Sequence, residues 1–391
     1  MHTARTILWA CCAILPGKAT PILSQTEARG LSQEILASDS NQGQSFIEAS
    51  IFGRWSRNED GPFESTATFA HLPQRDCFSD NTDPFDIAVV GAPFDLGVSF
   101  RPGARFGPTA ARTSSMRYNP LMGYSTDHPS LNPFTSWATI VDCGDIANTP
   151  FDKLAAIKQL QHGMAAILSG KTSSTEDGTQ RRVITIGGDH TISLPVLRAL
   201  HKQRGPIAVL HFDSHLDSWD PKVLSGGISK YSDINHGSMF HILAEEGALL
   251  PDANVHLGTR SMLFDASADL ENDARCGFSI IRASHIDQIG VQGIVRRVKN
   301  IVGDMPVYVS IDVDSLDPAF APATGTLEIG GWSTREMVQV LRGLAAAGIK
   351  IVGGDVVEFS PVYDNTAGTT GMAVAHIVYE LLMWMVQVPV A

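Results

Sequence analysis

The segment IAVLHFDSHLD at positions 207–217 joins a short apolar run directly to acidic and imidazole side chains. A near-continuous apolar run is typical of a strand that is covered on both faces of a parallel sheet. Side chains at alternate positions of extended chain point to the same side, so Asp213, His215 and Asp217 are expected to converge beyond the strand. The segment therefore predicts a buried strand that ends in a cluster of polar side chains.

Six further apolar runs predict other strands of the same sheet. Three of them also end in polar side chains, in GGDH (187–190), in DVD (312–314) and at Glu358. Ligands of open α/β sheets bind beyond the carboxyl ends of the strands, so these groups are expected to share one edge with residues 213–217. The seven predicted strands cover residues 87–90, 138–141, 183–186, 207–212, 255–257, 307–311 and 351–357.

Segments with helical spacing of apolar residues lie between the predicted strands. One helix is expected after Thr149-Pro150, which resemble a cap and a first-turn proline. A second has the capping-box pair Ser333 and Glu336 and a stop at Gly348, and a third is the apolar run 372–385. Alternation of strands and helices predicts an α/β fold with a mainly parallel sheet.

The predicted cluster combines carboxylates with imidazoles, and unpaired carboxylates in a crevice of low dielectric would repel one another. One or two divalent cations resolve this conflict. Hard carboxylate oxygens together with two imidazoles suit Mn²⁺, with Zn²⁺, Co²⁺ and Fe²⁺ as rivals. A single Asp or His at a strand end is usually a cap or a turn former. The joint occurrence of these groups after four strands nevertheless predicts a metal centre.

The chain has 391 residues, a formal net charge of −12 and a pI of about 5.5. This acidity argues against a nucleic-acid binder, which needs a basic face to offset phosphate charge. It is compatible with a cationic substrate, although most acidic proteins are simply soluble. A chain of this length can bury a large core without disulfide staples.

The N-terminus is expected to be a targeting segment. Arg5 precedes the apolar run 7–15, which is too short to cross a bilayer and is typical of a signal peptide, here residues 1–19. A mitochondrial transit peptide is the alternative, because no acidic residue occurs before Glu27. Residues 20–82 are expected to form an N-terminal extension and residues 83–391 the main domain. No other apolar stretch is expected to span a membrane.

Five cysteines are present, and their spacing shows neither a CxxC pair nor a disulfide framework. Removal of a signal peptide would leave Cys77, Cys143 and Cys276. An odd number implies at least one free thiol, which is expected to be a small buried side chain.

Four motifs together resemble the ureohydrolase family of arginase and agmatinase. They are GGDHTISLP (187–195), FDSHLDSWDP (212–221), SIDVDSLDPAFAPATGT (310–326) and DVVEFSP (355–361). The segment GAPFDLGVSFRPGARFGP (91–108) is similar to the first strand and loop of the agmatinase branch. Taken jointly, these motifs are highly specific. The resemblance covers residues 83–391 as a ureohydrolase catalytic domain and leaves the N-terminal residues outside.

The resemblance implies a three-layer α/β/α fold and a pair of Mn²⁺ ions. Six residues match the family's metal ligands, and two of these, Asp213 and Asp312, would bridge the ions. One ion would be held by His190, Asp213, Asp217 and Asp312, and the other by Asp213, His215, Asp312 and Asp314.

The resemblance also assigns two catalytic residues. Glu358 matches the glutamate that binds the guanidinium group, and a carboxylate pairs well with two N–H groups of that planar cation. His236 matches the proton-shuttling histidine, a task that suits the ordinary pKa of imidazole. Asp317 is expected to orient the loop that carries Asp312. Two further histidines are expected to be structural, namely His211 and His376.

The implied reaction is hydrolysis of a guanidino compound to urea and an amine, with agmatine as the preferred substrate and putrescine as its product. Residues 218–231 are expected to line the pocket mouth, where Asp220 or Asp233 would meet the distal amine of agmatine. Guanidinobutyrate and guanidinopropionate are the alternatives, and Lys222 or Lys230 would meet their carboxylate.

Two other classes of function compete with this hypothesis. Loss of a metal ligand or of Glu358 would favour a non-catalytic metal-dependent binding protein, and neither is lost. A binuclear phosphoesterase would need basic groups, and only Lys222 and Lys230 are close to the motifs in sequence. Members of the ureohydrolase family usually form trimers or hexamers. The expectation is therefore a homo-oligomer that binds a small guanidino substrate and neither nucleic acid nor membrane.

Overall fold

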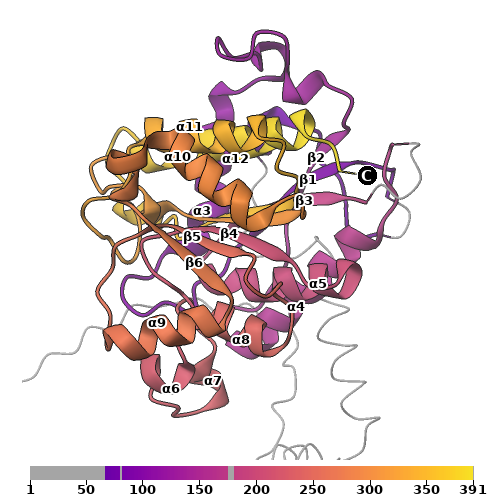
Figure 1. Ribbon diagram of the computed structural model, residues 1–391. Coiled ribbons are helices and arrows are strands. Elements are labelled where there is room, and N and C mark those ends of the chain that lie inside the picture. The colour runs from indigo at the N-terminus through magenta and orange to yellow at the C-terminus, as the bar shows by residue number, and fades with distance from the viewer. Residues whose placement is uncertain (1–66, 80–81, 175–179, 391) are drawn as a thin grey trace, which may run out of the picture. The chain divides into compact units, whose positions relative to one another are not determined.

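The computed structural model describes residues 67–79, 82–174 and 180–390, all within the compact unit Phe52–Ala391 (Figure 1). Eight strands form one parallel sheet in the order β2-β1-β3-β8-β7-β4-β5-β6. Helices cover both faces of the sheet, which confirms the predicted three-layer α/β/α fold. The expected targeting segment 1–19 and residues 20–66 of the expected extension lie outside the described residues.

Seven of the eight strands match predicted ones, and β6 was not predicted. Only two of its five residues, Phe278 and Ile281, are buried, because β6 lies at the edge of the sheet. An interrupted apolar pattern hides such a strand from a search for continuous runs. The strands are β1 (Ile87–Ala92), β2 (Ile140–Asp145), β3 (Arg182–Gly187), β4 (Ala208–Phe212), β5 (Asn254–Thr259), β6 (Phe278–Arg282), β7 (Val307–Asp312) and β8 (Ile351–Val357).

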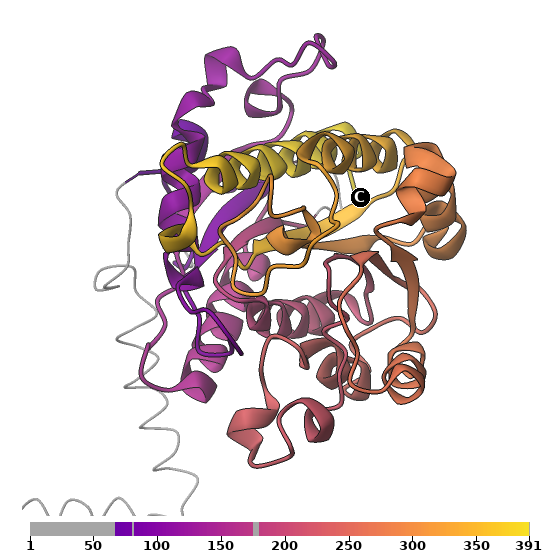
Figure 2. The same cartoon turned by 90° about the vertical axis from the view of Figure 1, so that its left-hand side faces the viewer.

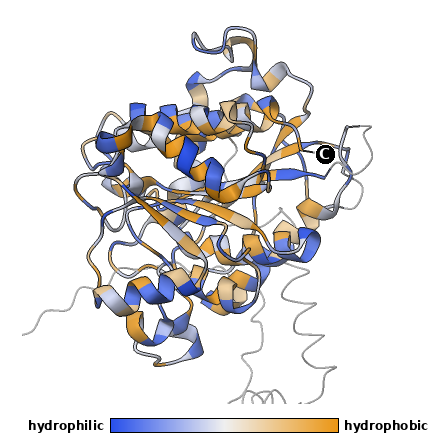
Figure 3. Cartoon of the chain, viewed as in Figure 1, coloured by the Kyte–Doolittle hydropathy of each residue, from blue (hydrophilic) through white to orange (hydrophobic). Residues whose placement is uncertain are grey.

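One face of the sheet packs against α3, α10, α11 and α12, and the other against α4, α5 and α8 (Figures 1 and 2). The strands are mainly hydrophobic, whereas the covering helices carry both polar and apolar residues (Figure 3). The helices are α3 (Gly107–Ser114), α4 (Lys153–Ser169), α5 (Ser193–Arg204), α6 (Pro221–Leu224), α7 (Lys230–Asp233), α8 (Met239–Glu245), α9 (Ala266–Arg275), α10 (His285–Val302), α11 (Thr334–Ala346) and α12 (Thr369–Gln387). The 3₁₀ turns are η1 (Phe69–His71), η2 (Ala104–Phe106), η3 (Ser115–Arg117), η4 (Pro120–Met122), η5 (Pro133–Thr135), η6 (His190–Ile192), η7 (Val313–Ser315) and η8 (Pro361–Tyr363).

The helix boundaries confirm one predicted cap and correct another. The side chains of Ser333 and Glu336 form the predicted capping box of α11. For α4 the predicted Thr149-Pro150 start is wrong, because Asp152 caps the helix by accepting the Ala155 N–H at 2.9 Å. An aspartate in extended conformation satisfies a free N–H of the first turn, so the helix begins after it.

Helix α12 is longer than predicted and runs through the interior. It is long and apolar enough to cross a membrane by length and composition alone, contrary to expectation, yet most of it is buried inside the domain. Its apolar residues pack with those of β8 and α11 in one core cluster. The composition of α12 is therefore explained by its central place in a packed layer.

A disulfide joins Cys77 to Cys143 across 66 residues of sequence, so the expectation that the cysteines form no disulfide framework is wrong. The segment before Cys77 packs beside β2, where the Phe69 N–H donates to Asp142 Oδ2 at 2.7 Å. The pairing depends on this tertiary contact, and cysteine spacing alone does not reveal it. Cys276 is free and buried, as expected.

Candidate metal centre and active site

Four neighbouring strands carry the predicted site at their carboxyl ends. Strands β3, β8, β7 and β4 lie side by side in the sheet. His190 begins η6 just after β3, Asp213 follows β4, Asp312 ends β7, and Glu358 follows β8. These side chains come together at one edge, as the motif spacing predicts.

His190 lies at the centre of the first group of potential ligands. Its Nδ1 is 3.1 Å from Asp213 Oδ2, 3.1 Å from Asp217 Oδ2 and 3.4 Å from Asp312 Oδ2. All four residues are buried. Within the described part of the chain, His190 Nδ1 and Asp213 Oδ2 have no hydrogen-bond partner. Donor atoms that crowd together without satisfying one another are suited to hold a cation between them.

The second group surrounds His215. Its Nδ1 is 3.2 Å from Asp213 Oδ1 and 3.0 Å from Asp314 Oδ2. Asp213 therefore presents one oxygen to each group, as a bridging ligand would. Asp312, the other expected bridge, faces His190 through Oδ2, whereas its Oδ1 accepts the Asp314 N–H at 2.7 Å.

Burial of these carboxylates shifts their pKa values. Burial, followed by the charges of Asp314 and Asp213, holds the pKa of Asp312 well above its usual range. Burial and the charge of Asp213 raise the pKa of Asp217 to about 6. Burial opposes ionisation of Asp213 too, but neighbouring imidazoles outweigh it and hold its pKa well below the usual range. The set of hard oxygens and imidazoles fits the predicted divalent cations, which would offset this mutual repulsion.

A buried chain of hydrogen bonds supports His190 from the side opposite its Nδ1. Its Nε2 lies 2.7 Å from Ser310 Oγ, which donates to Asp355 Oδ1 at 2.6 Å. Such outer partners fix the orientation of an imidazole ligand. The support comes from β7 and β8, so the sheet itself holds the ring.

Glu358 has one carboxylate oxygen that is engaged and one that is free. Its Oε1 accepts the His190 N–H at 2.9 Å and lies 2.9 Å from His236 Nδ1. Its Oε2 is buried and has no hydrogen-bond partner among the described residues. The backbone of Glu358 has φ of +63°, a left-handed conformation that is rare outside glycine and concentrates at functional sites. This residue is held in place to present a carboxylate.

His236 bridges Glu358 and the loop after β1. Its Nε2 accepts the Ser99 N–H at 3.1 Å and lies 2.7 Å from Ser99 Oγ. Burial lowers the pKa of His236, but the Glu358 carboxylate outweighs it and the pKa is raised to about 9. Sequence reasoning missed Ser99, although it lies within a quoted motif, because nothing local links it to His236, which is 137 residues away.

A cavity of about 240 Å³ opens beside the two groups of ligands. Apart from potential ligands and His236, its charged lining residue is Glu328, whose Oε1 is 3.8 Å from His215 Nε2. The lining contains no lysine or arginine among the residues described. The apolar side chains around the cavity are Trp219, Leu224, Met262 and Phe264.

The expected contacts for the distal end of the substrate are not found. Asp220 caps α6 by accepting the Lys222 N–H at 2.8 Å, and Asp233 accepts from Ser225 Oγ at 3.2 Å. Neither these aspartates nor Lys222 and Lys230 line the cavity. Capping of α6 turns Asp220 toward a local partner, and Asp233 likewise pairs with nearby Ser225.

Three other expectations concern residues around the ligands. Asp317 accepts the N–H groups of Ala319 and Gly330, so it orders the loop that follows Asp312 and η7. His376 lies in a different pocket, against Tyr118. His211, expected to be structural, belongs to the buried cluster, with Nε2 2.9 Å from Asp213 Oδ2.

Comparisons with known proteins agree with this geometry. The model of the arginase family matches residues 85–384. The chain is 50% identical over 339 residues to a Schizosaccharomyces pombe protein named "Putative agmatinase 1", which covers 85% of each chain. It is 35% identical to a guanidinobutyrase of Pseudomonas aeruginosa, over 83% of this chain and 94% of that one.

Solved structures give the same result. The proclavaminate amidino hydrolase of Streptomyces clavuligerus superposes with a TM-score of 0.71 and 34% sequence identity, over 84% of this chain and 100% of that chain. The chain therefore belongs to the arginase family, in its agmatinase branch.

Proposed function

We propose that this protein hydrolyses a guanidino compound to urea and an amine, with agmatine as the preferred substrate and putrescine as its product. The observation that carries the proposal is Glu358 Oε2, a buried carboxylate oxygen without a described partner beside a cluster of metal-type donors. A planar guanidinium offers paired N–H groups to such a carboxylate. Placed against Glu358, the guanidinium would lie next to the first ligand group, because Glu358 Oε1 accepts the His190 N–H at 2.9 Å.

Two divalent cations are part of the proposal. His190, Asp213, Asp217 and Asp312 would hold one ion, and Asp213, His215, Asp312 and Asp314 the other. When bound, such a pair lowers the pKa of a water molecule and supplies the attacking oxygen. Mn²⁺ is the proposed metal because hard carboxylates dominate the set, with Zn²⁺, Co²⁺ and Fe²⁺ as rivals.

The chain's own residues orient the substrate and move the proton. Glu358 would hold the guanidinium through its free Oε2, and its Oε1 would keep His236 in reach of the leaving nitrogen. His236 would protonate the departing amine. Ser99 donates its N–H to His236 Nε2 in the structure, so it keeps the imidazole at the cavity wall until the substrate arrives.

The lining of the cavity favours a substrate with a positive distal end. Glu328 is an anion at this wall, and no described lysine or arginine is present to pair with a carboxylate. Agmatine ends in a protonated amine, which can pair with the Glu328 carboxylate and brings no negative charge to this wall. Guanidinobutyrate remains the second candidate, because the chain is similar to a guanidinobutyrase over most of its length. The lack of a described lysine or arginine in this lining also argues against a phosphoesterase.

The test is urea release from agmatine, guanidinobutyrate and arginine after the purified protein has been loaded with Mn²⁺. The expected result is urea from agmatine at the highest kcat/KM. Faster turnover of guanidinobutyrate would make that compound the preferred substrate and would leave the proposed reaction, hydrolysis to urea, unchanged. No urea from any guanidino compound, with two ions bound per chain, would overturn the proposal and favour a non-catalytic binding protein.

We also propose that the protein enters the secretory pathway and assembles as a trimer or hexamer. The Cys77–Cys143 disulfide supports an oxidising compartment, and the alternative of a mitochondrial location predicts two free thiols at these positions. The mature N-terminus and the localisation of the tagged full chain would decide the first point. Light scattering of the metal-loaded protein would decide the second.

A further inference from the structure

Four buried acid–base side chains form a line that extends from the metal-binding edge of the sheet to helix α9. His211 of β4 and His256 of β5 are register partners, and their Nδ1 atoms are 2.7 Å apart. His256 Nε2 lies 2.8 Å from Asp273 Oδ1 on α9, and His211 Nε2 lies 2.9 Å from Asp213 Oδ2. Each of these four residues is at most 1% exposed. The proposed chemistry uses only Asp213 of this line.

The contacts link the four residues in series. His211 Nε2 and Asp213 Oδ2 lie 2.9 Å apart, and neither atom has a hydrogen-bond partner among the described residues. One hydrogen lies between the Nδ1 atoms of His211 and His256, and the tautomers decide which ring carries it. The Asp273 carboxylate accepts from the other nitrogen of His256 and supplies a negative charge beside it. The orientation of His211 is therefore set by residues two contacts away from the metal centre.

Asp273 has a second connection to the proposed ligands. Its Oδ1 accepts from Ser218 Oγ at 2.5 Å, and the neighbouring Asn272 donates to the Ser218 carbonyl. Ser218 follows Asp217, whose φ of +54° is left-handed and unfavourable for an aspartate with no local support. Helix α9 therefore contacts the proposed ligands by two routes. It binds Ser218, which follows Asp217, and it contacts His256, which leads through His211 to Asp213.

A purely structural role explains this line poorly. The His256 ring is stacked on Phe278, with centroids 4.0 Å apart and planes 10° from parallel, so an apolar side chain would pack well at this position. Burial of an imidazole and a carboxylate costs solvation free energy that an apolar pair would not. The presence of this polar pair in the core indicates a task that needs hydrogen bonds.

We propose that His256 and Asp273 are positioning residues of the metal centre. They hold His211 against the bridging Asp213, and Asp273 also holds Ser218 so that Asp217 faces His190. The inference rests on the proposed binuclear centre. Neither residue touches substrate or metal, so both act through other side chains.

The test compares Mn²⁺ affinity in three variants of the full chain, by chelator competition and by the electron paramagnetic resonance of free Mn²⁺. We expect His256→Leu and Asp273→Asn to bind at least one ion roughly 10–100-fold more weakly, as is usual when an outer partner of a ligand is removed. Ser218 and His256 both contact Asp273 Oδ1, so Asp273→Asn can keep an acceptor oxygen for them and removes the negative charge. It therefore tests the charge beside His256 and is available if His256→Leu does not fold. The control is Thr185→Val, which removes a buried hydroxyl of β3 that has no hydrogen-bond partner among the described residues.

Further readouts separate positioning from structure. The melting temperature of the metal-free variants should stay near that of Thr185→Val, and excess Mn²⁺ should restore most of the urea release. Because both residues act through one line, the double variant should lose little more affinity than either single variant. Wild-type Mn²⁺ affinity in folded His256→Leu and Asp273→Asn would overturn the inference. If the wild type itself binds no Mn²⁺ or releases no urea, the proposed function fails instead.

Discussion

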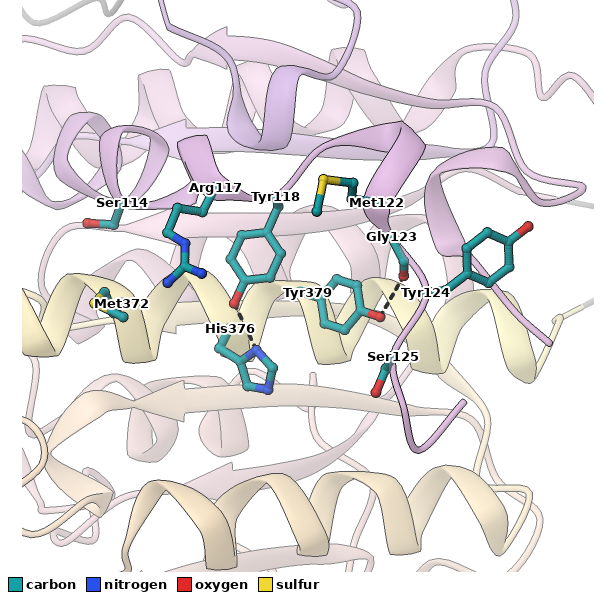
Figure 4. A pocket seen from close by; sticks show the side chains of 10 residues that line it. All are labelled: Ser114, Arg117, Tyr118, Met122, Gly123, Tyr124, Ser125, Met372, His376 and Tyr379. Atoms are coloured by element: carbon teal, nitrogen blue, oxygen red, sulfur yellow. Dashed lines mark hydrogen bonds between the residues drawn. The ribbon is translucent and has the colours of Figure 1, made fainter. Parts of the chain in front are cut away.

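Two cavities of this molecule are lined by different kinds of side chains. The aromatic pocket, formed by Tyr118, Tyr379, His376 and their neighbours between η3 and α12, has a volume of about 390 Å³ (Figure 4). The cavity at the metal centre has about 240 Å³. Two tyrosine hydroxyls of the aromatic pocket are paired: the Tyr118 hydroxyl meets His376 Nδ1 at 2.8 Å, and the Tyr379 hydroxyl donates to the Gly123 carbonyl at 2.8 Å.

Buried, unsatisfied charge distinguishes the cavity at the metal centre from the larger aromatic pocket. Rings in the aromatic pocket stack on one another, with Tyr118 and Tyr379 centroids 5.4 Å apart. Burial raises the pKa of Tyr118 to about 12, so it remains a neutral phenol at physiological pH. The smaller cavity instead gathers carboxylates whose pKa values are strongly displaced. Perturbed titratable groups of this kind cluster at functional sites.

The largest effect should come from a bridging ligand. Asp312→Ala removes a carboxylate that the proposal assigns to both ions, so kcat should fall on the order of 10⁴-fold or more. Urea release and metal content of the purified variant provide the measurement. Near wild-type turnover by Asp312→Ala would show that the cavity at the metal centre is no more important for the reaction than the aromatic pocket.

His236→Asn should have the next largest effect. An asparagine occupies a similar volume but cannot carry a proton to the leaving amine, so kcat should fall by about 10²–10³-fold with a smaller change in KM. The pH–rate profile should also lose the limb that belongs to this imidazole. An unchanged rate and profile would rule out the shuttle role.

Glu358→Gln should weaken substrate recognition. The amide still accepts the His190 N–H but lacks the charge that pairs with a guanidinium, and kcat/KM should fall roughly 10–100-fold. Steady-state kinetics with agmatine at saturating Mn²⁺ would measure this. Equal kcat/KM in the variant and the wild type would place the guanidinium elsewhere in the cavity.

A smaller effect is expected in the pH dependence of metal-free stability. The pKa of His236 is raised to about 9, above the ordinary value of about 6.5. A raised pKa stabilises the folded state fully below the unfolded-state pKa, and this stabilisation is lost as the pH rises through the folded-state value. The free energy of unfolding of the wild type should therefore approach that of His236→Asn between about pH 6.5 and about pH 9. A constant difference across this window, measured by denaturant titration, would contradict the ion pair.

Tyr118→Phe should have almost no effect on urea release. The substitution removes the contact with His376 in the aromatic pocket and should cost about 0.5–1.5 kcal/mol of stability. Thermal denaturation and kcat/KM measured on the same sample would separate the two quantities. A tenfold loss of kcat/KM would show that the aromatic pocket takes part in catalysis.

The sequence predicted the parts of the site that depend on local spacing. Asp213, His215 and Asp217 follow one strand at alternate positions, so their convergence follows from extended geometry. Ser99 and Glu328 were missed, because loops distant in the sequence bring them to the cavity wall. Edge strand β6 was missed because it is only half-buried, and Asp220 was given the wrong role because a short helix captures its side chain.

The Cys77–Cys143 crosslink has a practical consequence for preparing this protein. The cytosol of a bacterial expression host keeps thiols reduced, so material made there would anchor the segment around Phe69 through noncovalent contacts alone. That segment donates a hydrogen bond to Asp142 of β2, which also accepts from Arg112 of α3. Samples from reducing and oxidising hosts are therefore different molecules, and a titration of free thiols belongs before any comparison of their stability or metal content.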